Sequence, residues 1–136
     1  MRKAFIFLLF LGLLAVPGLA RSEKANTVLI HPGETIYARF ERKGRSLKLI
    51  TASPVKDEAA QLIFQMSRWD REKSIITLQV ENKFDKDLDY EAEMRLLKPY
   101  LHQPTPVSPI VAGKFGMESW STIIQELALA GFKLEN

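Results

Sequence analysis

Apolar and polar residues alternate along most of this chain, which is the pattern of half-buried β-strands. Within residues 34–41, for example, Ile36, Ala38 and Phe40 share one face of an extended chain, and polar or half-polar residues share the other. Turn residues separate the alternating segments about every eight to twelve positions, as in antiparallel sandwiches and barrels. Strands are expected at residues 27–30, 34–41, 47–51, 62–66, 76–80 and 88–96.

The remainder of the chain is less regular. Four prolines occupy residues 99–109, where they cannot donate backbone hydrogen bonds, so we expect a loop or an edge strand there. Apolar residues recur at helical spacing between Trp120 and Leu127, but from Leu127 to Leu134 they alternate, with a one-residue slip at Ala130-Gly131 that is typical of a bulged strand. We expect a final strand, with a short C-terminal helix as the alternative.

Two stretches resemble known bacterial proteins. The segments LQVEN (78–82) and LDYEAEM (88–94) resemble the central strands of immunoglobulin-like sandwiches in bacterial envelope proteins, in which a strand ending in Asn precedes one with a buried Tyr. Residues 108–134 are similar to the C-terminal half of a group of small, uncharacterised periplasmic proteins. The resemblance implies a single immunoglobulin-like β-sandwich of seven or eight antiparallel strands, and it implies no catalytic residues.

The first twenty residues have the three parts of a secretory signal peptide. A basic start at Arg2 and Lys3 precedes an apolar run of 13 residues, and small residues precede a cleavage point after Ala20. A membrane anchor is the alternative, but the run is well short of the about 20 residues that span a bilayer. We expect residues 1–20 to be removed, residues 21–136 to form one domain without a transmembrane segment, and the mature chain to be periplasmic or secreted.

Charge and cysteine content narrow the function classes. The 19 Lys and Arg residues exceed the 16 Asp and Glu, but Arg2 and Lys3 leave with the signal peptide, so the mature balance is 17 to 16, or +1. This balance provides no general basic surface for phosphate, so nucleic acid is not an expected partner. The chain has no cysteine, which excludes disulfides, thiolate catalysis and Cys-ligated zinc.

Three aspartates have the spacing that opens a calcium-binding loop, but later positions of the loop do not match. Asp85, Asp87 and Asp89 follow the D-x-D-x-D pattern, but Tyr90 and Leu96 occupy the sixth and twelfth positions, where Gly and Glu are required. We therefore expect no metal site.

The same region nevertheless presents an acidic face. Asp87, Asp89, Glu91 and Glu93 alternate with apolar residues, so all four share the outward side of one strand. This face is either a solvated surface that discourages strand pairing or a surface that binds a cation or a basic partner.

No local signature of catalysis is present. His31 and His102 are the only histidines, and we expect both at the surface or in turns. No serine lies in a nucleophile motif, and no glycine-rich phosphate loop exists. We expect a protein that is not an enzyme and has no cofactor.

Two features are candidate interaction sites. Arg42, Lys43 and Arg45 surround the turn at Gly44, where a local basic excess attracts anionic partners. Trp69 lies near the tip of another turn, where an exposed aromatic ring is a contact residue; the alternative is a ring folded over the end of the core. The sequence therefore predicts an exported, non-enzymatic binding or assembly-accessory module of the bacterial envelope, whose partner is another envelope protein or an anionic surface. The alternative is an inhibitor or modulator of an envelope enzyme that uses a loop such as 67–73 or 101–109.

Overall fold

The structure is a computed structural model that describes residues 26–70, 75–96 and 101–136, and all regular secondary structure in these ranges is β-strand. The prediction of an all-β fold is confirmed. The strands are β1 (Val28–Ile30), β2 (Thr35–Lys43), β3 (Ser46–Ser53), β4 (Leu62–Asp70), β5 (Ile75–Asn82), β6 (Leu88–Leu96), β7 (His102–Thr105), β8 (Phe115–Trp120) and β9 (Ile124–Leu134). The predicted signal peptide, residues 1–20, lies outside the described residues.

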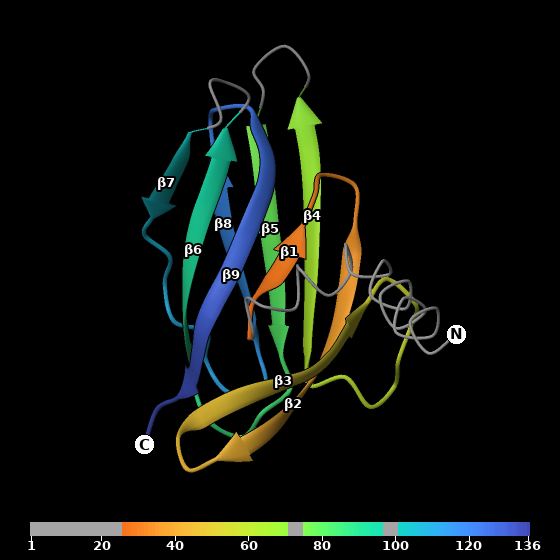
Figure 1. The fold of residues 1–136 in the computed structure, drawn as a ribbon, viewed down its shortest axis with the longest axis vertical. Helices are drawn as coiled ribbons and strands as arrows, with labels where there is room; N and C mark the ends of the chain where they lie inside the picture. The colour runs from red at the N-terminus through yellow and green to blue at the C-terminus, as the bar shows by residue number, and fades with distance from the viewer. Residues whose placement is uncertain (1–25, 71–74, 97–100) are drawn as a thin grey trace, which may run out of the picture.

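The strands form one antiparallel sheet that curls on itself. Its order is β7-β6-β9-β3-β2-β4-β5-β8, and β1 pairs with β9 beside this path. In Figure 1, β6, β7 and β9 lie in front of β5 and β8, so the two ends of the sheet form facing layers. The layers are joined at β3, where Ser46 pairs with Lys133 of β9.

The core lies between these layers and follows the predicted alternation. Along β5, for example, Ile76, Leu78 and Val80 are buried, and the residues between them are only partly covered. Phe132 of β9 connects the layers, because its ring centroid lies 5.1 Å from that of Phe40 and 5.8 Å from that of Phe64. A single aromatic cluster therefore joins β9 to β2 and β4.

The alternative of a short C-terminal helix is wrong, because residues 124–134 form β9. The helical spacing arises from bulges. One register shift leaves Gln125 unpaired between Ile124 and Glu126, and a second falls near Gly131, whose φ of 64° suits the left-handed position of a bulge. Each bulge adds a residue, so buried side chains recur three positions apart without a helical turn. The one-residue slip predicted at Ala130-Gly131 is confirmed.

The described residues form nine strands, where seven or eight were expected. Residues 102–105 form the edge strand β7, within the segment predicted to be a loop or an edge. The strand β8 was not predicted, because its sequence FGMESW has only two alternating apolar residues before Ser119, too short a run to indicate a strand. In the structure Phe115 and Met117 face outward and are each 61% exposed.

Candidate functional site

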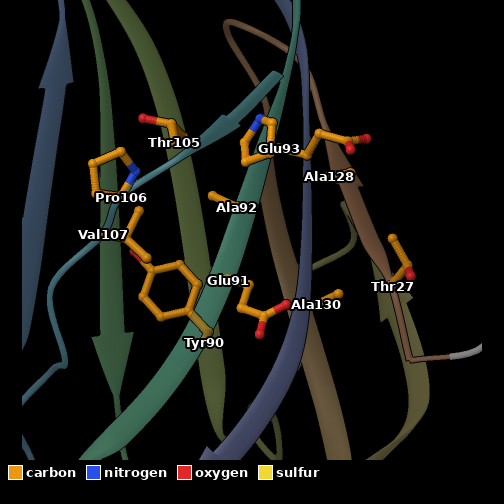
Figure 2. A pocket seen from close by; sticks show the side chains of 11 residues that line it. Thr27, Tyr90, Glu91, Ala92, Glu93, Thr105, Pro106, Val107, Ala128 and Ala130 are labelled. Atoms are coloured by element: carbon orange, nitrogen blue, oxygen red, sulfur yellow. The ribbon is translucent and has the colours of Figure 1, made fainter. Parts of the chain in front are cut away.

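The candidate site is an open groove of about 620 Å³ along β9 (Figure 2). Its floor is low because β9 carries alanine at the outward positions 128 and 130. The antiparallel register places Glu93 opposite Ala128 and Glu91 opposite Ala130, so β6 forms one wall. Thr27, just before β1, lines the other side. The lining crosses from Thr27 over β9 to β6, and the two alanines, like the two glutamates, lie two residues apart on their strand, which is the spacing of same-side residues in an extended chain.

Beyond β6 the groove reaches the end of β7, where its lining is largely apolar. Tyr90, Thr105, Pro106 and Val107 line this part, and the Tyr90 ring points toward Val107 in Figure 2. Thr105 is held in place by Trp120, whose indole Nε1 donates a hydrogen bond to the Thr105 hydroxyl at 2.8 Å. The sequence analysis did not predict this wall, because it depends on β7 pairing with β6.

The two carboxylates of the groove contact different residues. Glu93 contacts His102 across the β6–β7 pair, with 3.2 Å between Oε1 and Nδ1. Glu91 lies over Gly131, so close that a Cβ added to this glycine would be 3.1 Å from the carboxyl carbon of Glu91. The β9 bulge therefore makes room for the Glu91 side chain. These residues belong to the acidic face predicted from the sequence, and the structure places them on a wall of the groove.

The arrangement of the two carboxylates gives one side of the groove a negative potential. Glu91 and Glu93 are two positions apart on one strand, so both carboxylates lie on the same wall. A pair that cleaves a glycosidic bond must flank that bond from opposite sides. Two adjacent carboxylates beside a floor of alanine instead create a negative potential next to an apolar surface.

Tyr90 is the ionisable group of the groove with the most perturbed environment. Burial, and to a lesser degree the charge of Glu118, raise the pKa of the Tyr90 phenol well above its ordinary value. The phenol is therefore neutral in the folded protein at a pH where an unfolded chain ionises it, near pH 10.

This shift predicts a loss of stability in alkali. The folded state keeps the Tyr90 proton while the unfolded state releases it, so the contribution of this group to stability is complete below about pH 10 and falls by up to about 1.4 kcal/mol per pH unit above it. Urea unfolding of the wild-type protein and of Tyr90→Phe at about pH 9 and about pH 11 measures the difference. A wild-type protein that loses no more stability than Tyr90→Phe between these conditions would contradict the assignment.

The basic tip, defined as Arg42, Lys43 and Arg45, is exposed at the β2–β3 turn as predicted. Two of its side chains make contacts that the sequence did not predict. Arg42 lies 3.2 Å from a carboxylate oxygen of Asp85, and Arg45 donates a hydrogen bond from Nε to the Leu134 carbonyl oxygen at 3.1 Å. These contacts attach the tip to the rest of the sheet and partly offset its charge. Whether it binds a partner stays a prediction.

Trp69, the other predicted interaction residue, is 71% exposed near the end of β4. Its indole Nε1 donates a hydrogen bond to the Thr77 hydroxyl of β5 at 3.0 Å. The ring therefore lies on the outer surface of the sheet, away from the core. The structure does not bring Trp69 and the basic tip into a common site.

His31 belongs to an ion-pair cluster that the sequence did not reveal. Its Nδ1 lies 3.0 Å from Glu34, its Nε2 lies 2.9 Å from Glu126, and Glu126 also contacts Arg95 at 3.0 Å. The cluster connects the β1–β2 turn to β9 and β6, next to a cleft of about 490 Å³. Both ring nitrogens face carboxylates, so the ring connects Glu34 to Glu126. Only the Glu34 contact, three residues away, was within reach of sequence reasoning.

Comparison of the chain with protein-family models, with curated proteins and with solved structures finds no match. In the described part of the chain, no helix is long and apolar enough to cross a membrane. Among the same residues, no three His, Asp or Glu side chains are grouped so that they could hold a metal ion.

Proposed function

We propose that this protein is an exported, non-enzymatic binding module of the bacterial envelope, and that the groove along β9 binds a basic, extended segment of a partner protein. One observation carries the proposal: Ala128 and Ala130 lie directly beside the carboxylates of Glu91 and Glu93. A segment in which Lys or Arg alternates with small apolar residues matches this surface, because successive side chains of an extended chain point to opposite sides.

We also propose that this all-β fold is an immunoglobulin-like sandwich. Two facing antiparallel layers and the buried pair Asn82 and Tyr90 support it. In such sandwiches recognition is carried by surfaces and loops around a rigid core, and no catalytic signature accompanies them here.

The proposed export has a direct test. If the signal peptide is cleaved after Ala20, the mature protein begins Arg21-Ser22-Glu23, and mass analysis of protein from the periplasm or medium of producing cells should give that N-terminus. A protein that retains Met1 in all fractions would contradict both the location and the mature net charge of +1.

Neutralising the carboxylate wall should weaken binding of a basic probe. The probe is a fluorescent peptide of alternating lysine and alanine, and its affinity is measured by anisotropy. Surface charge pairs contribute up to about 1 kcal/mol each, so Glu91→Gln combined with Glu93→Gln should weaken binding about tenfold. Binding to the wild-type protein should also weaken as salt is added.

The matched control is Glu41→Gln combined with Glu58→Gln, which removes the same charge from exposed positions outside the groove. This variant should bind the probe almost as the wild-type protein does. Equal weakening by both double variants would mean that only net charge matters, and the groove would then not be the site. A glutamate–alanine peptide should not bind any of the proteins.

Exposure of Trp69 favours a second candidate function, modulation of an envelope enzyme through this end of the molecule. An exposed aromatic ring is a common binding anchor. The segment 101–109 is a weaker candidate for an inserting loop than the sequence suggested, because the edge strand β7 occupies part of it. Trp69→Ala should leave peptide binding in the groove unchanged, so the two functions can be tested separately.

A further inference from the structure

The strand β8 is an exposed edge of the sheet. It pairs with β5 on one side, and in the described residues no strand pairs with it on the other. The edge strand at the opposite end, β7, contains Pro104, which has no N–H to offer a further strand. No proline occurs in β8, and its register with β5 runs from Phe115 to Trp120 without a shift. Natural edges usually carry a proline, a bulge or charged residues; β8 has no proline and no bulge, and its one charge, Glu118, points inward.

The outer face of β8 is apolar. Phe115 and Met117 are each 61% exposed, and Ser119 completes the outward row. Glu118, the one charged residue of the strand, points the other way, because its carboxylate accepts a hydrogen bond from the Ser108 N–H at 2.7 Å. The face therefore presents no charge that would select a charged partner strand.

The sequence of β8 is complementary to itself. If two copies pair antiparallel about a two-fold axis at Met117, the two Met117 residues lie opposite each other and Phe115 lies opposite the second copy's Ser119. Glu118 then lies opposite the second copy's Gly116, so no two like charges meet. A two-fold interface requires such self-complementarity, and like charges directly opposite on paired strands would oppose it.

We propose that two copies of this protein associate through β8, which would continue the sheet across a two-fold axis. The proposal is independent of the groove, because the groove floor belongs to β9 and β9 takes no part in the pairing. A dimer would carry two grooves, so a partner with two basic segments would be held by both.

Sedimentation equilibrium of the purified protein tests the association. The expected result is a species of twice the monomer mass. Met117→Lys should raise the dissociation constant about tenfold or more, since it places two ammonium groups opposite each other at the axis. The matched control is Gln79→Lys, which adds the same charge to the neighbouring strand at the position paired with Met117. A protein that is monomeric up to about 1 mM, or a dimer weakened equally by both variants, would overturn the proposal.

The register has its own test, because the chain has no cysteine of its own. Directly opposite residues of antiparallel strands have Cα atoms about 4.5 to 5.5 Å apart, which is within disulfide range. Oxidation of a mixture of Phe115→Cys and Ser119→Cys should yield several-fold more disulfide-linked dimer than either variant alone. If every variant folds and the mixture gives no more disulfide-linked dimer than the single variants, pairing about Met117 is contradicted.

Discussion

Phe64→Ala is expected to lower the free energy of unfolding by about 3–5 kcal/mol, because the substitution leaves a cavity in the centre of the core. Phe64 has no exposed surface, and its ring lies 5.8 Å from that of Phe132 on the facing layer. In the sheet it is paired with Ile36 on one side and Val80 on the other, and both are buried. Urea unfolding measures the loss.

Gln65→Ala is the matched control on the same strand. Gln65 is exposed and paired with Gln79, so this substitution should change stability by less than about 0.5 kcal/mol. Similar losses for Phe64→Ala and Gln65→Ala would mean that the strand is shifted by one residue, which would exchange its two faces.

Asn82→Ala is expected to cost about 3 kcal/mol, although it removes little apolar surface. Asn82 is fully buried at the end of β5, and its Nδ2 donates hydrogen bonds to the Lys86 and Ile110 carbonyl oxygens at 2.9 and 3.0 Å. Its Oδ1 accepts a hydrogen bond from the Phe84 N–H at 2.9 Å. Alanine would leave the Phe84 N–H and the Lys86 carbonyl without this partner, while the Ile110 carbonyl keeps its hydrogen bond from the Leu88 N–H, and each unsatisfied buried group costs about 1–3 kcal/mol.

Asn82→Asp separates the donor role from the acceptor role. An aspartate keeps the shape and the acceptor for Phe84 but places a carboxylate oxygen against the two carbonyl oxygens. The variant should be least destabilised in acid, where a protonated carboxyl group can donate, and should lose stability as the pH rises. Urea unfolding at about pH 4 and about pH 7 measures this, and a pH-independent loss would contradict the donor role of Nδ2.

Local alternation was sufficient to predict six strands and their buried faces. The pattern in residues 76–80 places Ile76, Leu78 and Val80 on one side of an extended chain whatever the neighbours are, and one apolar face must be buried. The edge position of residues 102–105 was within reach because proline acts locally.

Bulges left two alternatives for the last segment, of which the expected final strand is the correct one, and the strand β8 was missed. A spacing of three between Ile124 and Leu127 fits both a helical turn and a bulged strand, and only the partner strand β6 decides between them. The strand β8 escaped prediction because its alternation ends at Ser119 after two apolar residues, and Gly116 and Glu118 occupy positions on its inward face. The sequence also indicated a freer basic tip, because it did not show that Asp85 lies beside Arg42.

The sequence by itself determined that this chain forms antiparallel strands, which side chains of those strands enter the core, and that Glu91 and Glu93 face outward on one strand. Only the tertiary structure decided that alanines 128 and 130 lie directly opposite these carboxylates and that β8 is left as an edge. The physical reason is that the face of a residue follows from the two-residue period of its own strand. Strand order and register depend on pairing between distant segments, whose energies are set by the whole sheet.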